Sequence, residues 1–244
     1  MHLAGERKGQ AGGGLGRWTQ GQGGEQARDR GIGDANYFND YYADRDWKWY
    51  RHILALAIQY SEPGAILDVG AGVGYLVECA MRWNLTCLGL EGSAAAVASA
   101  QARCPSINLR QHALSEPFPF TDASVGSVFM NQVIEHLEPE VATGCLEECW
   151  RVLCPGGMLF VFSPSCYNVE EANADATHIH MYSPTELRQL LAAKGFGDVR
   201  SFDSPLPLLG RSTLATRVMY FVFKLTRWER LSASANCIAF KGAR

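Results

Sequence analysis

The stretch that decides the fold is AILDVGAGVGYL, Ala65 to Leu76. It starts as a short apolar run with one carboxylate, Asp68, and continues into glycines at every second position, Gly70, Gly72 and Gly74. A strand that ends in a glycine turn at the start of a helix brings the backbone close to a ligand, and glycine tolerates the positive φ that such a turn needs. The stretch therefore predicts a nucleotide-type site at the end of the first core strand.

Apolar runs alternate with helical patterns along most of the chain. The predicted strands are 65–70, 86–92, 107–114, 124–132, 157–164, 198–205 and 235–242, and the predicted helices between them include 75–83, 93–104, 139–153 and 183–196. Strands that alternate with crossover helices indicate an α/β fold, a mostly parallel sheet with helices on both faces.

Two segments carry clear local signals. Helix 183–196 has Ser183 as its N-cap, a proline in its first turn, Glu186 three residues after the cap and Gly195 at its end. A turn is predicted at 155–157, where Pro-Gly-Gly precedes a strand.

The composition bounds the class of protein. The chain has 244 residues, of which 47% are hydrophobic, enough for one α/β domain over 36–244. Residues 1–35 are rich in glycine, glutamine and charge, so we expect a disordered leader. The eight cysteines form no CxxC pair and no zinc-type cluster, so we expect reduced thiols, no metal site and a cytoplasmic protein.

Charge is distributed unevenly around a net charge of −3. Residues 36–205 carry 10 basic and 20 acidic side chains, whereas residues 206–244 carry 7 and 1. An acidic body argues against a general nucleic-acid binder.

Within the basic insert 206–231, Leu214, Val218, Phe221, Leu225 and Trp228 form a helical stripe. The helix either packs on its own domain or, as a basic amphipathic helix, makes a weak peripheral contact with a membrane or grips an anionic substrate.

The glycine pattern does not suit a dinucleotide. A dehydrogenase fingerprint is G-x-G-x-x-G, and its third glycine position is Tyr75 here. Asp68 lies in an apolar strand, and Glu91 ends the next strand, where an acid can accept from both hydroxyls of a ribose. A loop that avoids a diphosphate, with a carboxylate beside it and a ribose acid, indicates S-adenosyl-L-methionine as the cofactor.

With these residues the chain resembles the class I S-adenosylmethionine-dependent methyltransferases. ILDVGAGVG and CLGLEGS carry the resemblance, as do FPFTDASVGSVFMNQVIEHL and LEECWRVLCPGGMLFVFSP around the fourth and fifth strands. ATHIHMYSPTEL is similar to the Thr-His segment of ubiquinone-biosynthesis-type O-methyltransferases. The resemblance implies a Rossmann-like, doubly wound sheet of seven strands whose last strand is antiparallel, and a transferase that acts on a small-molecule, lipid-linked or sugar-linked acceptor.

The resemblance also implies a set of cofactor-binding residues. The glycine loop would line the methionine part, Asp68 would orient its amino group, and Glu91 would bind the ribose. His112 and Ala113 occupy the place where relatives hold the adenine with Asp-Ala, so His112 departs from the pattern. The full set is Asp68, Gly70, Ala71, Gly72, Gly74, Glu91, Gly92, His112, Ala113, Asn131 and Gln132.

Three histidines are candidates for the chemistry. An acceptor hydroxyl loses its proton during in-line methyl transfer, and a histidine near neutral pKa is a natural base. We expect His178 or His136 to be catalytic, and His178, His180 and Tyr182 to bind the acceptor. Each of these histidines can equally serve a structural hydrogen bond. We expect the aromatic segment 36–60 to form a lid over the cofactor or a helix packed on the sheet.

An inactive, cofactor-binding module is the alternative to an enzyme. Besides His112, the departure that suggests it is Gly126, which replaces an aspartate usual before the fourth strand of relatives.

Overall fold

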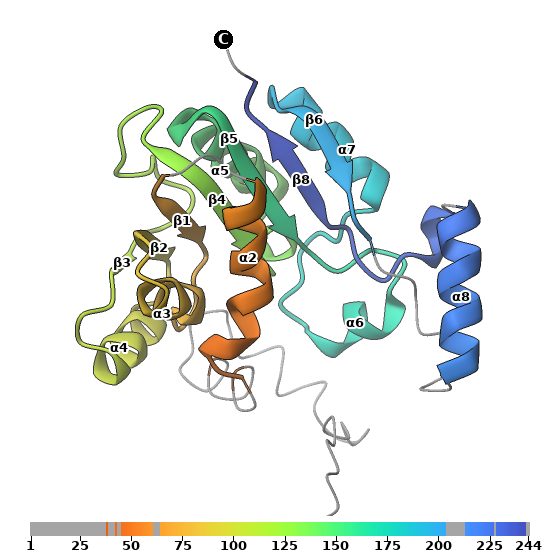
Figure 1. Ribbon diagram of the computed structural model, residues 1–244, viewed down its shortest axis with the longest axis horizontal. Helices are drawn as coiled ribbons and strands as arrows, with labels where there is room; N and C mark the ends of the chain where they lie inside the picture. Colours follow the sequence, from red (N-terminus) through yellow and green to blue (C-terminus); the bar gives the residue numbers. More distant parts are fainter. Residues whose placement is uncertain are drawn as a thin grey trace, which may run out of the picture.

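Seven strands form one sheet in the computed structural model, which describes residues 38, 42, 45–60, 64–203, 213–226 and 228–242. Their order is β3-β2-β1-β4-β5-β8-β6 (Figure 1). The strands are β1 (Ile66–Val69), β2 (Cys87–Glu91), β3 (Leu109–Gln111), β4 (Val125–Asn131), β5 (Leu153–Phe162), β6 (Gly197–Ser201) and β8 (Cys237–Phe240). β1 to β5 pair in parallel, and β8 is antiparallel to both β5 and β6. The predicted fold class, including the antiparallel last strand, is confirmed. The predicted leader lies outside the described residues.

Helices cover both faces of the sheet. The α-helices are α2 (Arg51–Tyr60), α3 (Tyr75–Arg82), α4 (Ala94–Arg103), α5 (Pro139–Val152), α6 (Val169–Ala174), α7 (Pro184–Ala193) and α8 (Thr213–Thr226), with 3₁₀ turns η1 (Trp47–Tyr50), η2 (Ile134–His136) and η3 (Glu229–Leu231). In Figure 1, α2 and α3 lie in front of the sheet, and α5 lies behind it. Among the described helices, none combines the length and the apolar character that a membrane span requires.

The sheet separates two hydrophobic cores. Successive side chains of a strand point to opposite faces, so Leu67 and Val69 pack with α5 and α7, whereas Ile66 packs with α2 and α3. On the second face the rings of Phe129 and Phe160 stack with centroids 4.6 Å apart. By the same alternation the buried Asp68 lies on the Ile66 side of the sheet.

Local signals account for most elements, with two differences. Ser183 and Glu186 form the predicted capping box at the start of α7. The turn at 155–157 is drawn into β5, which starts at Leu153, because the pairing with β4 shifts register there and Gly156 adopts a φ of 79°. The short helix α6 was not predicted.

The described side chains of the insert's apolar stripe are exposed. Val218, Phe221 and Leu225 of α8 are 53%, 62% and 67% exposed, and Trp228 beyond its end is 58% exposed. Phe223, on the opposite side of the helix, is buried. Figure 1 shows α8 at one edge of the domain, away from the centre of the sheet. The described part of the stripe is therefore not the packed side of α8, which buries Phe223 instead, and both interpretations of the insert stay predictions.

Candidate functional site

The glycine loop folds tightly over the end of β2. Gly70, Gly72 and Gly74 have φ values of 71°, 53° and 76°, a conformation that costs other residues about 1–2 kcal/mol. The N–H groups of Gly70 and Ala71 both donate to the carbonyl of Leu90, at 2.9 and 3.0 Å. A Cβ at Gly70 would overlap the side chain of Val133. The loop therefore needs glycine for two reasons: its backbone has positive φ values, and at Gly70 the neighbouring side chain leaves no room for a Cβ.

Glu91 joins this loop to the end of β2. Its carboxylate is buried and accepts the N–H of Gly72 at 2.7 Å and the N–H of Ser93 at 2.8 Å. Burial raises the pKa of Glu91, and these backbone donors oppose the increase. Ser93 also caps α4, since its side chain accepts the N–H of Ala96. Glu91 is thus fixed in place with lone pairs left over for a ligand.

A cavity of about 710 Å³ opens beside these residues, a size typical of small-molecule sites. It lies at the carboxyl ends of β1, β2 and β4, where ligands bind in sheets of this kind. Six of the predicted cofactor residues line it: Gly70, Gly72, Glu91, Gly92, Asn131 and Gln132. The rest of the wall consists of Phe38, Tyr42, Ser93, Ala94, Leu114, Ser115, Val133, His136, Leu137, Glu138, Val141 and Ile179.

Asp68 lies behind the cavity instead of on its wall. The side chain is 4% exposed, between Gly89 and Phe129 of the neighbouring strands. Burial, with a smaller contribution from the charge of Glu91, raises the pKa of Asp68 to about 7. Among the described residues, the charged neighbour that affects Asp68 is another acid.

The end of β4 separates two cavities. Gln132 adopts a φ of 56° and donates its N–H to the carbonyl of Phe162 at 2.8 Å. Asn131 and Gln132 line the large cavity and also a second one of about 320 Å³, whose other walls include Arg45 and Trp49. A strained residue between two cavities is typical of a functional site.

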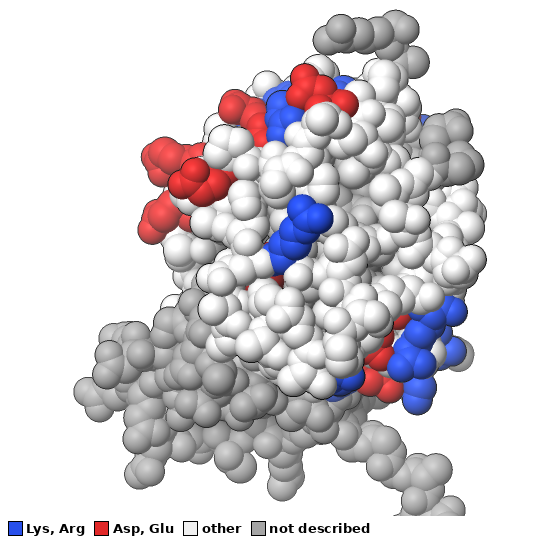
Figure 2. Space-filling model, turned by 90° about the vertical axis from the view of Figure 1, so that its left-hand side faces the viewer, with Lys and Arg blue, Asp and Glu red and all other residues white. Residues whose placement is uncertain are grey.

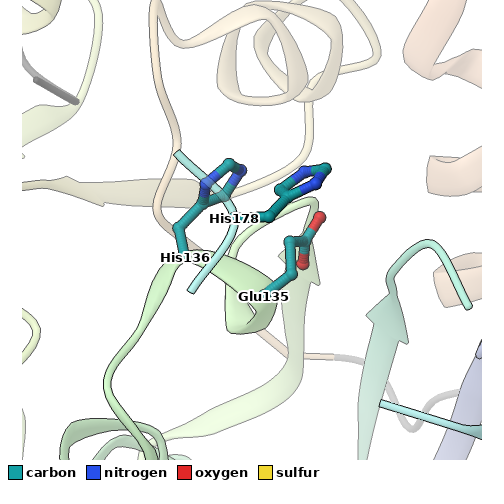
Figure 3. Close-up of side chains that lie close together, drawn as sticks. All are labelled: Glu135, His136 and His178. Atoms are coloured by element: carbon teal, nitrogen blue, oxygen red, sulfur yellow. The ribbon is translucent and has the colours of Figure 1, made fainter. Parts of the chain in front are cut away.

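Three side chains meet at the His136 end of the large cavity. Glu135 and His136 are adjacent in η2, and His178 comes from the loop after α6. The imidazole rings lie 4.8 Å apart, and Figure 3 shows the Glu135 carboxylate pointing toward the ring of His178. Burial lowers the pKa of both histidines and raises the pKa of Glu135 to about 8.

A hydrogen-bonded chain orients His136. The Thr177 hydroxyl donates to Asp175 at 2.5 Å, so its oxygen is an acceptor toward Nδ1 of His136, 3.0 Å away. The carbonyl of Thr177 lies 3.2 Å from the same nitrogen. Nδ1 therefore carries the proton and donates, which leaves the lone pair of a neutral His136 on Nε2.

Other predicted residues lie elsewhere. His112 and Ala113 are not on the cavity wall, where Leu114 and Ser115 stand instead, and the ring of His112 faces the carbonyl of Glu116 at 3.3 Å. Gly74 packs toward Ile107, away from the cavity.

The two further acceptor residues also point away. His180 pairs with Glu186 at 2.9 Å, and Tyr182 is buried in the core that packs against α5. The structure thus brings His136 and His178 together but not His180 or Tyr182.

Some site residues were missed from the sequence. Glu135 was not singled out, although a carboxylate in the apolar run Val133 to Leu137 is an unusual signal. Arg45 lies at the second cavity, whereas Arg51 donates from Nε to the carbonyl of Lys48. Leu114 and Ser115 gave no signal of their own.

Known sequences with similarity to this chain are methyltransferases. Residues 67–161 match the family model of a methyltransferase domain. A probable S-adenosylmethionine-dependent methyltransferase of Mycolicibacterium smegmatis is 34% identical over 134 residues, 54% of this chain and 51% of the relative. A tRNA N(3)-methylcytidine methyltransferase of Drosophila melanogaster is 22% identical over 64% of the chain and 57% of the relative. The chain spans about half the length of the curated relatives it matches.

Solved structures share the fold. A SAM-dependent methyltransferase from Archaeoglobus fulgidus superposes with a TM-score of 0.65 at 19% identity, covering 84% of this chain and 99% of that one. Phosphoethanolamine N-methyltransferase 2 of Haemonchus contortus, in complex with phosphomonomethylethanolamine and S-adenosylhomocysteine, gives 0.61 at 16% identity over 85% of this chain and 57% of that one. Residues 67–161 are thus similar to S-adenosylmethionine-dependent methyltransferase domains, and S-adenosyl-L-methionine is the cofactor that this similarity supports.

Proposed function

We propose that this protein, whose residues 67–161 form a methyltransferase domain, transfers a methyl group to an oxygen of a small-molecule, lipid-linked or sugar-linked acceptor. The observation that carries the proposal is that Glu91 and His136 line one cavity, so a ribose-binding acid and an imidazole face the same ligand space. When bound, S-adenosylmethionine supplies a methyl group on a cationic sulfur. The protein's own task is then to position the acceptor, which is the main source of catalysis in a displacement of this kind.

Glu91 and the glycine loop hold the cofactor. Each carboxylate oxygen of Glu91 uses one lone pair for a backbone N–H and keeps another for a ribose hydroxyl. Gly70 and Gly72 allow the methionine part to approach the backbone. Asp68 acts on the amino group only through the loop in front of it, and Leu114 and Ser115, which follow His112 and Ala113 in the chain, form the cavity wall beside the adenine.

His136 acts on the acceptor. Its Nδ1–H is engaged by Thr177, so the free Nε2 is the atom available to take a hydroxyl proton at the cavity wall. His178 lies behind it and shapes the same end of the cavity. Phe38 and Tyr42 close the cavity over the glycine loop, and we assign residues 36–60 the role of a lid that excludes water.

On the face at the β3 edge, the charge of the described residues fits a small acceptor better than a nucleic acid. At the β3 edge of the molecule, acidic and basic side chains of the described residues lie in small separate groups, without a continuous basic area (Figure 2). The matched tRNA methyltransferase makes RNA the second candidate, which the experiment below separates.

The experiment is incubation with methyl-labelled cofactor and a fractionated cell extract, with Glu91→Ala protein as the background. We expect label in the organic or small-molecule fraction. Chemical cleavage of methyl–oxygen bonds should release that label, because the methyl group is linked to oxygen. Label confined to a ribonuclease-sensitive precipitate would overturn the small acceptor. If no fraction gains label while calorimetry still detects bound S-adenosylhomocysteine, the protein is an inactive cofactor-binding module instead.

We assign the exposed side of α8 a weak contact with an anionic membrane surface. Val218, Phe221 and Leu225 supply the apolar side, and the exposed Lys224 and Arg230 supply positive charge, each worth about 1 kcal/mol near anionic lipid. Flotation with phosphatidylglycerol-containing vesicles tests the contact. Phe221→Glu with Leu225→Glu should abolish it, whereas Val169→Glu, at an exposed apolar residue of α6, should not. Equal flotation of all three proteins would refute it.

A further inference from the structure

Three buried atoms of the described chain lack a hydrogen-bond partner, and all three lie in the Glu135–His136–His178 cluster. They are both carboxylate oxygens of Glu135 and Nδ1 of His178. The buried Ser163 hydroxyl donates to the carbonyl of Pro164 at 3.3 Å. An unpaired buried polar group costs about 1–3 kcal/mol, and more when it is charged. Three of them in one place need an explanation.

We propose that Glu135, His136 and His178 bind a divalent first-row transition metal ion, whose remaining coordination positions open toward the cavity. Each residue offers one ligand atom, and these atoms lie within 4.8 Å of one another. Ligand atoms about 2.0–2.2 Å from one ion lie roughly 3–4 Å apart, so side-chain rotations that close the cluster by about 1 Å complete the site.

The donor set determines the class of ion. Two imidazoles and one carboxylate suit Zn²⁺, Co²⁺, Fe²⁺ or Mn²⁺, whereas Mg²⁺ and Ca²⁺ prefer oxygen ligands alone. Three protein ligands leave at least one position for water or substrate, as in catalytic metal sites. His136 lines the cavity, so this open side faces the proposed acceptor.

The surroundings prepare the ligands for an ion. Nδ1–H of His136 is held by Thr177, which presents Nε2 as the ligand atom and supplies the outer hydrogen bond typical of metal-bound histidines. The N–H groups of Ile179 and His180 donate to the carbonyl of Glu135 at 2.8 and 3.1 Å. These bonds tie the loop that carries His178 to η2, which carries the other two ligands.

An ion also resolves the electrostatics of Glu135. The side chain is fully buried, and both of its carboxylate oxygens lack a hydrogen-bond partner among the described residues. In the described chain no lysine or arginine forms an ion pair with it within 4.0 Å. A bound cation offsets the free-energy cost of burying a charged carboxylate.

The role of the ion rests on the proposed function, whereas its binding does not. With the ion present, His136 is a ligand, and the acceptor oxygen is activated by coordination instead of by free imidazole. The acceptor hydroxyl then releases its proton to water, and its oxygen forms the new bond to the methyl carbon as the carbon–sulfur bond breaks.

The test is titration of chelator-treated full-length protein with Co²⁺, followed by calorimetry and by the visible absorption of the ion. A Cys166→Ser background removes the exposed thiol as a competing ligand. We expect one bound Co²⁺ and at least 10-fold weaker binding in Glu135→Gln and in His178→Gln. His180→Gln is the matched control for Co²⁺ affinity, because His180 lies on the same loop but pairs with Glu186. Mg²⁺ should not compete at the same concentrations.

Binding of S-adenosylhomocysteine keeps the two proposals separate. It should be unchanged in Glu135→Gln, which also shows that this variant is folded. Co²⁺ affinity that is equal in wild type and in the Glu135→Gln/His178→Gln double variant would overturn the metal site and leave the methyltransferase proposal standing. Stoichiometric, variant-sensitive Co²⁺ binding without any labelled methyl product would support the metal site and count against the proposed reaction.

Discussion

The carboxylate of Glu91 accepts the backbone N–H of Gly72 at 2.7 Å, across 19 residues of sequence. Its other oxygen accepts the N–H of Ser93, so one acidic side chain connects the glycine loop, the end of β2 and the start of α4. The acid that is proposed to hold the ribose is therefore also the group that fixes the loop against which the cofactor packs.

Glu91→Gln should weaken S-adenosylhomocysteine binding by about 10- to 100-fold. The amide keeps one acceptor oxygen but places an NH₂ group against a backbone N–H donor, which costs about 1–3 kcal/mol. Calorimetric titration measures the affinity, and Glu140→Gln, in the exposed first turn of α5, controls for the loss of one negative charge. Equal affinity of Glu91→Gln and Glu140→Gln for S-adenosylhomocysteine would show that Glu91 does not bind the cofactor.

Gly72→Ala should destabilise the protein by about 1–2 kcal/mol and weaken cofactor binding at least 10-fold. Gly72 has a φ of 53°, which alone costs an alanine about that much. A Cβ would also overlap the Tyr42 hydroxyl. Urea unfolding and calorimetry measure the two effects. Adding Tyr42→Ala should recover part of the stability if the overlap contributes, and none if only φ matters.

Gly144→Ala is the matched control for this substitution. Gly144 lies exposed within α5 with nothing within 4 Å of an added Cβ, so alanine should stabilise the helix by about 0.5–1 kcal/mol. A destabilisation of Gly144→Ala as large as that of Gly72→Ala would show that the glycine loop has no special requirement.

Local patterns explain why so much of the cofactor side could be predicted. The glycines, the acid at the end of β2 and the capping box of α7 are each set by a few neighbouring residues, and parallel strands bring their carboxyl ends to one edge. The packing of Asp68 could not be predicted in the same way. Its position in an apolar strand is visible in the sequence, but the charge of Glu91 near it depends on tertiary structure.

The acceptor side depends on contacts that no local pattern encodes. His178 meets Glu135 only because two N–H groups of its loop donate to the Glu135 carbonyl. His180, two residues further on, turns to the first turn of α7 instead, since Glu186 offers it a carboxylate. The helical period of α8 was visible in the sequence, but whether Phe221 is covered depends on neighbouring elements.

Asp68→Asn should stabilise the cofactor-free protein more at pH 8 than at pH 5. The folded-state pKa of Asp68 is about 7, raised from 3.8, so ionising this side chain costs folding free energy that increases between those two values. Three pKa units correspond to about 4 kcal/mol, of which roughly 2–3 kcal/mol accumulates between pH 5 and pH 8. Urea unfolding at both pH values measures the difference, with the exposed Glu170→Gln as a charge control. A gain that is independent of pH would contradict the raised pKa.

In Thr177→Val, His136 should no longer be held in a single tautomer. In the metal-free protein the Asp175–Thr177 pair holds the proton on Nδ1, and ¹⁵N-detected NMR of the imidazole should show that single tautomer. Valine removes the hydroxyl at constant shape, so a mixture of tautomers and about 10-fold weaker Co²⁺ binding are expected. Thr177→Ser restores the hydroxyl and should restore both properties, which a purely structural role of Thr177 would not require. A valine variant with the tautomer and the Co²⁺ affinity of the wild type would show that the Thr177 carbonyl alone orients His136.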